Sequence, residues 1–166
     1  MKTSIVYILK LIILACCHMV DKEFISNNNW FKMTYPKNWT EFEEDNGAYL
    51  FMDNDNWKGS LRITALRLSK GDEASKKEFL NTTLKEELEE NIGAIKVKLG
   101  SKDAVYYVKD SEDEGKPLEI HYWMTGEKTT LLICTFTIDK DKALKKEIIK
   151  EFELVKKTLA SIQVID

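Results

Sequence analysis

The stretch LLICTF, residues Leu131 to Phe136, decides the fold because it is apolar at nearly every position. A strand with one face in water alternates apolar with polar side chains, whereas this stretch turns apolar side chains to both faces. We therefore expect it to lie in the middle of a sheet that is covered on both sides. Two amphipathic helices elsewhere in the chain are the natural covers, which predicts an α/β/α sandwich.

Alternating segments on either side of this stretch predict the rest of the sheet. Phe31, Met33 and Tyr35 alternate with polar residues until Pro36, which cannot donate a hydrogen bond to a ladder. The other predicted strands are 39–42, 48–52, 60–68, 95–99, 105–109, 118–125 and 129–138. A two-residue type II′ turn at positions 126–127, which begin with glycine, suits the last pair of strands. The pattern predicts an antiparallel sheet of about six or seven strands.

Two helices are predicted from apolar residues at helical spacing. In the first, Ser75 and Glu78 have the spacing of a capping box, and Gly93 ends the helix. Its apolar residues are Leu80, Leu84, Leu88 and Ile92. The second helix is predicted to have Asp139 or Asp141 as its cap. Its apolar stripe is Leu144, Ile148, Phe152, Val155, Leu159 and Ile162. Sequential hairpins with segregated helices define an α+β fold, in a single domain over residues 24–166.

The composition excludes some functional classes. The chain has 166 residues, of which 43% are hydrophobic, as one globular domain with one core requires. It has 25 basic and 28 acidic residues, and the lysines lie among acids, so we expect no nucleic-acid partner. Its 3 cysteines, two of them adjacent, indicate no disulfide framework. No cofactor is expected.

Residues 1–20 allow two interpretations, which both stay open. The apolar run 4–14, followed by Ala15 and Cys16, resembles a bacterial lipoprotein signal, and acylation of Cys16 would anchor the protein to a membrane. Lys10 interrupts this run, and Leu14 is bulky for a position two before the cysteine. In the second interpretation Met19 is the true start, and the protein is cytoplasmic.

The first candidate site is aromatic. Six aromatic residues, four of them within ten positions, have the ring area to stack on a sugar, a peptide or a hydrophobic partner. They are Trp30, Phe31, Tyr35, Trp39, Trp57 and Trp123. The period-2 alternation of the first segment favours a structural role instead, with alternate members in the core.

The second candidate is the run from Asp53 to Asn56, which places oxygens at alternate positions as a calcium loop does. Lys58 stands where such a loop needs glycine, and Thr64 where it needs a bidentate glutamate. A turn whose Asx side chains bind their own backbone fits the sequence better. No metal site is expected.

The third candidate contains catalytic residue types. With the turn at 126–127, Glu119 pairs with Cys134, and His121 lies on the same face of the sheet. Thiol, imidazole and carboxylate are the groups of a nucleophile, a base and an orienting acid. A cysteine in the middle of an apolar strand is more often a small buried hydrophobe, so no catalytic residue is predicted.

The fourth candidate is acidic. Glu43, Glu44 and Asp45 precede one predicted strand, and the loop 111–115 carries a second acidic group. Two acidic loops favour a basic protein partner, whose association they would accelerate. Solvated hairpin tips are the simpler interpretation of the same residues.

The chain also resembles a family of uncharacterised bacterial domains, on the following residues. They are Asn29 to Trp39, Leu50 to Met52, Asp55, Trp57, Leu61 to Ala65 and His121 to Gly126. In fold, that family resembles the PsbP subunit of photosystem II and the nuclear Ran-release factor Mog. The resemblance implies an antiparallel sheet between helices and a binding role without catalysis.

Three functional hypotheses follow. The first is a non-enzymatic binding protein with a protein partner, in a specific version an immunity-type protein that neutralises a toxin. The second is a cell-envelope lipoprotein that binds a small ligand. The third is a hydrolase that depends on Cys134. The residues proposed for binding are Trp30, Trp39, Trp57, His121, Trp123, Glu43, Glu44 and Asp45.

Overall fold

The computed structural model describes residues 21–45 and 47–165 as two antiparallel sheets and two helices. The large sheet has seven strands in the order β3 (Thr40–Glu43), β4 (Tyr49–Met52), β5 (Ser60–Arg67), β9 (Thr130–Asp139), β8 (Lys116–Glu127), β7 (Lys102–Asp113) and β6 (Ile95–Leu99). The small sheet has the order β1 (Lys22–Ile25), β2 (Phe31–Tyr35) and β10 (Gln163–Val164). The helices are α1 (Glu73–Glu90) and α2 (Lys146–Ser161), and a short 3₁₀ helix, η1 (Lys140–Lys142), precedes α2.

The predicted α+β class is confirmed, and so is the position of Leu131 to Phe136. These residues lie in β9, the fourth and central strand of the large sheet. The strand from Phe31 to Tyr35 exists as predicted, but it belongs to the small sheet. Alternation shows that a strand has one buried face without showing which sheet the strand joins.

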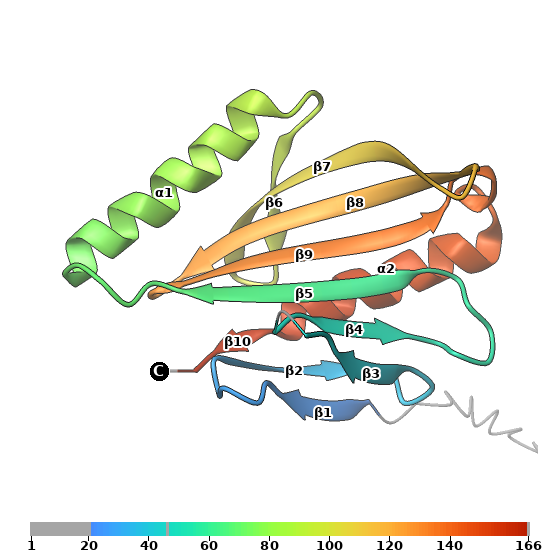
Figure 1. Cartoon of the computed structure of the whole chain (residues 1–166), viewed down its shortest axis with the longest axis horizontal. Helices are drawn as coiled ribbons and strands as arrows, with labels where there is room; N and C mark the ends of the chain where they lie inside the picture. Colours follow the sequence, from blue (N-terminus) through green and yellow to red (C-terminus); the bar gives the residue numbers. More distant parts are fainter. Residues whose placement is uncertain (1–20, 46, 166) are drawn as a thin grey trace, which may run out of the picture.

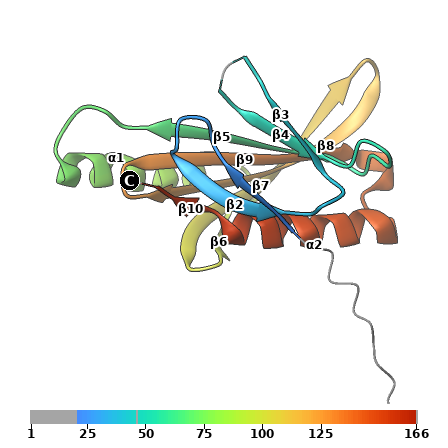
Figure 2. The ribbon, with the colours of Figure 1, turned by 90° about the horizontal axis from the view of Figure 1, so that it is seen from below.

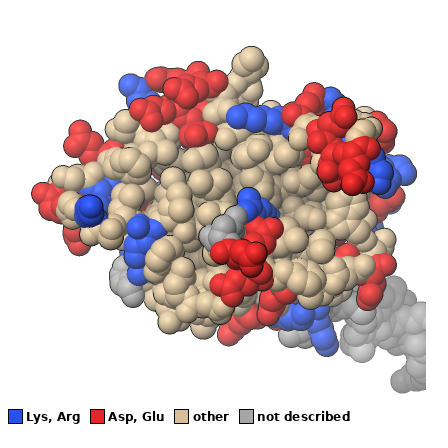
Figure 3. Space-filling model, in the orientation of Figure 1, with Lys and Arg blue, Asp and Glu red and all other residues tan. Residues whose placement is uncertain are grey.

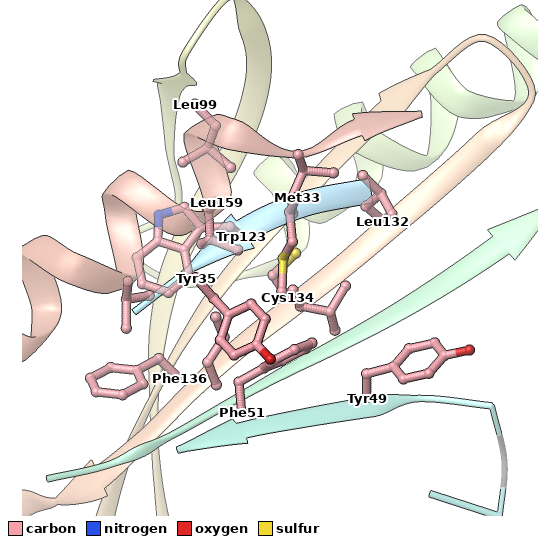
Figure 4. Close-up of a cluster of buried hydrophobic side chains, with 14 of the residues drawn as sticks. Met33, Tyr35, Tyr49, Phe51, Leu99, Trp123, Leu132, Cys134, Phe136 and Leu159 are labelled. Carbon is pink, nitrogen blue, oxygen red and sulfur yellow. The ribbon is translucent and has the colours of Figure 1, made fainter. Parts of the chain in front are cut away.

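One face of the large sheet, the back, is covered by α2 and by the small sheet (Figures 1 and 2). Val155 and Leu159 of α2 are fully buried in the same core as Cys134 and Phe136 of β9 (Figure 4). The small sheet contributes rings, such as that of Phe24, which packs edge-on at 5.1 Å between centroids against a ring of β4. The apolar face of β9 that carries Cys134 therefore packs into the main core.

Both helices begin and end away from the predicted positions. Asp72, not Ser75, is the N-cap of α1, and its side chain accepts a 2.8 Å hydrogen bond from the Ser75 amide. Both residue types suit a cap, so the sequence alone does not separate them. The helix α2 begins only at Lys146, after η1, and neither predicted aspartate caps it. As a result Ile92 and Leu144 lie outside the helices and are 98% and 92% exposed.

The turn between β8 and β9 lies two residues later than predicted. Glu127 pairs with Thr130, so the turn residues are Lys128, whose φ is 56°, and Thr129. Gly126 lies within the ladder, where it pairs with Leu131, and α1 packs directly on it. A Cβ atom at this position would lie 3.1 Å from the Cβ of Leu80. The glycine therefore provides close approach for a helix and not a turn.

The helix α1 lies on the other face of the sheet, the front, where it packs against β7 and β8. Within the described residues, Leu80 is the one buried side chain of α1. It lies in a small cluster with Met124 and Leu131. The layers thus follow the predicted α/β/α order. Coverage is uneven, however, because α1 crosses one end of the sheet and leaves β5 and most of β9 uncovered in front (Figure 1).

Candidate functional site

The uncovered part of the front is the candidate functional site, which we call the open face. Cross-strand pairing places Leu50, Arg62, Thr135 and Tyr122 in one row across β4, β5, β9 and β8. All the side chains of the open face are partly exposed although they stand in the middle of a sheet. They are Leu50, Arg62, Thr64, Tyr122, Ile133, Thr135 and Thr137. Such a surface combines apolar area with hydroxyl groups and one guanidinium.

Acidic hairpins border the open face. The loop between β3 and β4, with Glu43, Glu44 and Asp45, and the tip between β7 and β8 both rise on the side opposite α2 (Figure 2). Glu44 accepts a 2.6 Å hydrogen bond from Nε of Arg62, which ties the first hairpin to the sheet. In Figure 3 the middle of this side of the molecule is largely tan, with red groups and some blue groups around it. Glu44 therefore contacts the open face, whereas Glu43 lies on the other side of the sheet, where it accepts hydrogen bonds from Asn27 and Tyr49.

Trp57 lies at the edge of the open face and is 41% exposed. Its indole Nε1 donates a 2.9 Å hydrogen bond to Oγ of Ser60, a residue of β5 on the same face as Arg62. The loop that carries it is held by Asp53, whose Oδ1 accepts from the amides of Asp55 at 3.2 Å and Asn56 at 3.1 Å. This Asx turn confirms the structural interpretation of the predicted calcium-like run.

Two stacked tyrosines separate the open face from α1. The rings of Tyr107 and Tyr122 are 4.8 Å apart with an interplanar angle of 13°, and Nζ of Lys109 lies 5.1 Å from the first ring. The Tyr107 hydroxyl donates a 2.9 Å hydrogen bond to Glu87 of α1. Burial, and then the Glu87 carboxylate, raise the pKa of Tyr107. This hydroxyl therefore stays protonated and anchors the helix.

The other predicted aromatics do not join Trp57. Trp39 and Trp123 are 1% and 3% exposed, in the core on the back of the sheet. Trp30 is half-buried, and the Arg67 guanidinium lies 5.6 Å from its ring. The structure therefore places Trp57 at the edge of the open face and does not bring the tryptophans together on one surface.

His121 is 8% exposed and lies in an aromatic cluster on the back of the sheet. Its Nδ1 is 2.8 Å from the Tyr106 hydroxyl, and its Nε2 is 2.9 Å from Oε1 of Glu119, off the line of a hydrogen bond. The Phe152 ring of α2 covers it at 4.7 Å between centroids. Burial lowers the pKa of His121, and Glu119 opposes this effect only in part. The neutral imidazole is therefore the stable form near pH 7.

Cys134 shares a sheet face with His121 and Glu119, as predicted, but it does not pair with Glu119. The later turn shifts the register, so that Cys134 pairs with Trp123 and Glu119 with Ile138. Four residues along β8 separate Trp123 from Glu119, or about 13 Å. The thiol is fully buried, and burial raises its pKa to about 12. This geometry does not assemble the predicted nucleophile, base and acid.

Within residues 21–45 and 47–165 no group of three or more His, Cys, Asp or Glu side chains is placed to hold a metal ion. Neither described helix has the length and apolar character that a membrane span requires. Cys16, the predicted lipidation site, lies outside the described residues.

Sequence reasoning missed most of the open face. We expect cover on both faces of Leu131 to Phe136, yet Thr135 and Thr137 of β9, with Arg62 and Thr64 of β5, form an exposed surface. A signal was present, because polar residues recur with period 2 in both strands. The apolar residues Leu131 to Cys134 obscure this pattern in β9. They are apolar on both faces because α1 covers the front of only that end of the strand.

The fold and the open face define an α+β domain with an antiparallel sheet backed by one long helix. A family model described as Domain of unknown function (DUF3805) matches residues 19–165, and the chain belongs to this family. The predicted membership of an uncharacterised family is thus confirmed. A search of curated proteins found no match.

Among solved structures, a crystal structure of a protein from Bacteroides thetaiotaomicron VPI-5482 is 31% identical with a TM-score of 0.71. The match covers 87% of this chain and 48% of that one, so the chain spans about half the length of that relative.

The predicted likeness to PsbP is also found. Cyanobacterial PsbP (CyanoP) from Synechocystis sp. PCC 6803 matches at 10% identity and a TM-score of 0.43, over 87% of this chain and 92% of that one. LpqN, involved in cell envelope biogenesis of Mycobacterium tuberculosis, matches at 12% identity and a TM-score of 0.48, over 90% and 92%.

Proposed function

We propose that this protein is a non-enzymatic interaction protein, and that it binds a partner protein on the open face. The observation that carries the proposal is a central sheet surface without a covering layer. Sheets in compact domains are normally covered where their strands carry apolar residues, as β4 does with Leu50. An exposed surface that mixes apolar, aromatic and hydroxyl-bearing side chains has the mixed composition of an interface between proteins.

The composition of the surface supports a protein partner. Trp57, Tyr122 and Arg62 belong to the residue types that contribute most binding energy at protein interfaces. Threonine hydroxyls beside them offer hydrogen bonds without a fixed direction. A small-ligand pocket would be concave and enclosed, whereas the open face is broad and bordered on two sides.

The specific version is an immunity-type protein that blocks a basic toxin. The acidic hairpins would attract such a partner over the Debye length and raise the association rate. This version depends on the charge of the hairpins alone. The wider proposal of a binding protein does not depend on it.

Affinity purification from the native cell tests the proposal, with three forms of the tagged protein. The wild type and Ser101→Arg, which changes an exposed turn on the α2 side, are expected to recover the same stoichiometric protein partner. Thr135→Arg, which puts a long cation in the middle of the open face, is expected to lose it. Recovery of no stoichiometric partner, or of one that Thr135→Arg retains, contradicts the proposal.

A further inference from the structure

We infer that α1 is a displaceable cover, which opens as a unit while the rest of the fold stays intact. Opening uncovers apolar side chains on the front of the sheet, those of Val105, Met124 and Leu131. The inference goes beyond the proposed function and does not depend on it, because it concerns the protein without a partner. It is carried by the packing of α1, by its hydrogen bonding and by the segments that join it to the sheet.

Helix α1 packs weakly compared with α2. Of the 18 residues described in α1 only Leu80 is buried, whereas α2, with 16 residues, has five buried residues. The cluster around Leu80 is also separate from the main core, in which Val155 and Leu159 of α2 lie. A segment with few buried apolar contacts opens at a lower cost in free energy than the global unfolding of the protein. We therefore expect α1 to be less stable locally than α2.

Open space lies along one side of α1. Two grooves, of about 330 and 560 Å³, are both lined by Asn81 and Leu84 of the helix. On the sheet, Val105 lines the smaller groove and Gly126 the larger one. A close-packed interior leaves few voids larger than a water molecule. Helix α1 therefore rests on the sheet without interlocking with it along its whole length.

A close contact and a hydrogen bond hold α1 in place. Leu80 sits on Gly126, where an added Cβ atom would lie 3.1 Å from the Cβ of Leu80. Glu87, about two turns further along the helix, accepts the 2.9 Å hydrogen bond from the Tyr107 hydroxyl. Among the described residues this is the one side-chain hydrogen bond between α1 and the sheet. Loss of either contact should therefore favour the open form.

The segments on both sides of α1 suit hinges. Gly71 precedes the helix with φ 90°, and Gly93 follows it with φ 76°. Residues 69–75 are exposed, and so are Ile92 and Gly93. Nothing lies within 4 Å of a Cβ atom added at Gly93, so this glycine serves the backbone conformation and not close packing. Because glycine changes its backbone angles at little cost, both segments can rotate without disturbing a packed core.

Opening enlarges the exposed surface of the sheet. Val105 pairs with Met124, and Met124 pairs with Ile133, so these three side chains form one row on the front. Ile133 already belongs to the open face. Met124 and Leu131 are each 5% exposed while α1 covers them. The opened protein would therefore present a continuous apolar surface that the closed protein hides.

Amide hydrogen exchange of the ¹⁵N-labelled full chain, followed by NMR, tests the inference. The amides of Leu84 and Leu88 are expected to exchange roughly a hundredfold or more faster than those of Val155 and Leu159. They should also respond less to low concentrations of urea, because local opening exposes little surface. Equal rates with equal urea dependence overturn the inference, since α1 then opens only when the whole protein unfolds. Protection that decreases steadily from the middle of α1 to its ends also overturns it, because the helix then frays.

Two neighbouring tyrosines supply matched variants for this measurement. Tyr107→Phe removes the hydroxyl bonded to Glu87 and keeps the ring that stacks on Tyr122. We expect it to accelerate exchange in α1 by roughly fivefold or more, because a hydrogen bond to a charged group is lost. Tyr106→Phe removes a hydroxyl on the back of the sheet, beside His121, and is expected to leave exchange in α1 unchanged. Equal effects of the two variants on α1 overturn the inference.

Thiol labelling checks that opening uncovers the sheet. Met124→Cys places a thiol beneath α1, while the native Cys134 lies in the main core of the same molecule. We expect iodoacetamide to modify the Met124→Cys thiol in the native protein, and to do so faster when Tyr107→Phe is added, while Cys134 stays unmodified. Peptide mapping by mass spectrometry separates the two thiols. Labelling of both at the same rate, or of neither, overturns the inference, because α1 then opens only with the whole fold or stays closed.

Discussion

The indole Nε1 of Trp39 donates a 2.7 Å hydrogen bond to Oε1 of Glu151, a carboxylate of α2 that is 3% exposed. The other oxygen of Glu151 lies 3.5 Å from Nζ of Lys58. Trp39 follows β2, Lys58 precedes β5, and Glu151 lies in α2, so one buried carboxylate joins three distant segments. The bond also explains why Trp39 does not belong to a binding surface.

We expect Trp39→Phe to lower the free energy of unfolding by about 2 to 3 kcal/mol. The substitution keeps an aromatic ring but leaves a buried carboxylate without its strongest donor. Glu151→Gln retains an acceptor for the indole, so its loss is expected to be smaller. Urea unfolding followed by circular dichroism measures both. A Trp39→Phe protein as stable as the wild type would show that this bond contributes nothing.

Gly59→Ala is expected to be far more destabilising than Gly47→Ala. Gly59 has φ 141°, and a Cβ atom there would overlap the Phe136 ring and lie 2.8 Å from Cγ2 of Ile138. Gly47 also has a positive φ, 75°, but nothing lies within 4 Å of its added Cβ, so its expected loss is roughly 1 kcal/mol. Thermal unfolding of the two variants compares them. Equal losses would mean that backbone strain, and not the packing against β9, decides the requirement at Gly59.

Cys134 is expected to resist iodoacetamide in the native protein at pH 8. It is fully buried, and burial raises its pKa to about 12, so almost no accessible thiolate forms. Peptide mapping by mass spectrometry separates Cys134 from Cys16 and Cys17. The matched sample is the same protein in urea, in which Cys134 should be labelled completely. Rapid native labelling would restore the hypothesis of a reactive cysteine.

The stability of the protein is expected to fall as the pH falls below about 6.5. Burial lowers the pKa of His121 in the folded state, so the unfolded chain binds the proton at higher pH than the folded chain does. The slope from one such group is at most about 1.4 kcal/mol per pH unit. Urea unfolding at pH 5.5 and 7.5 should show a larger loss for the wild type than for His121→Asn, which does not titrate. Equal losses would assign the pH dependence to other groups.

Trp57→Ala is expected to leave stability within about 0.5 kcal/mol and to abolish recovery of the partner. The indole is 41% exposed and makes one hydrogen bond, to Ser60, so folding depends on it little. Trp30→Ala is the matched control, since Trp30 is also partly exposed but packs against Arg67 away from the open face. Recovery of the partner by Trp57→Ala would remove the indole from the interaction site.

The sequence predicted the fold class and the central strand because these depend on local periodicity. The apolar run from Leu131 to Phe136 located β9. Cys134 and His121 were correctly predicted on one face, because the turn moved the strand pairing by an even number of residues and so kept each side chain on its face. The sequence prediction missed the true turn, because Gly126 has the chemistry of a turn residue and only its contact with Leu80 shows another role. Contacts between distant segments leave no such local pattern.

The candidate site was predicted less well than the fold. The charge of Glu43, Glu44 and Asp45 predicts a binding surface, and the hydrogen bond from Arg62 places Glu44 beside the open face. The chemistry of Trp39, Trp123 and His121 also predicts binding, but they are core residues. Composition alone does not distinguish an aromatic that covers a partner from one that fills a core.

The hydroxyl groups of Thr64, Thr135 and Thr137 also affect the solubility of the protein when no partner is bound. Valine has the same shape and a comparable preference for strands, so valine at these positions would preserve the sheet. Valine would also make the open face apolar, and an exposed apolar surface promotes aggregation as the protein concentration rises. The three threonines therefore keep the protein soluble while no partner covers the open face.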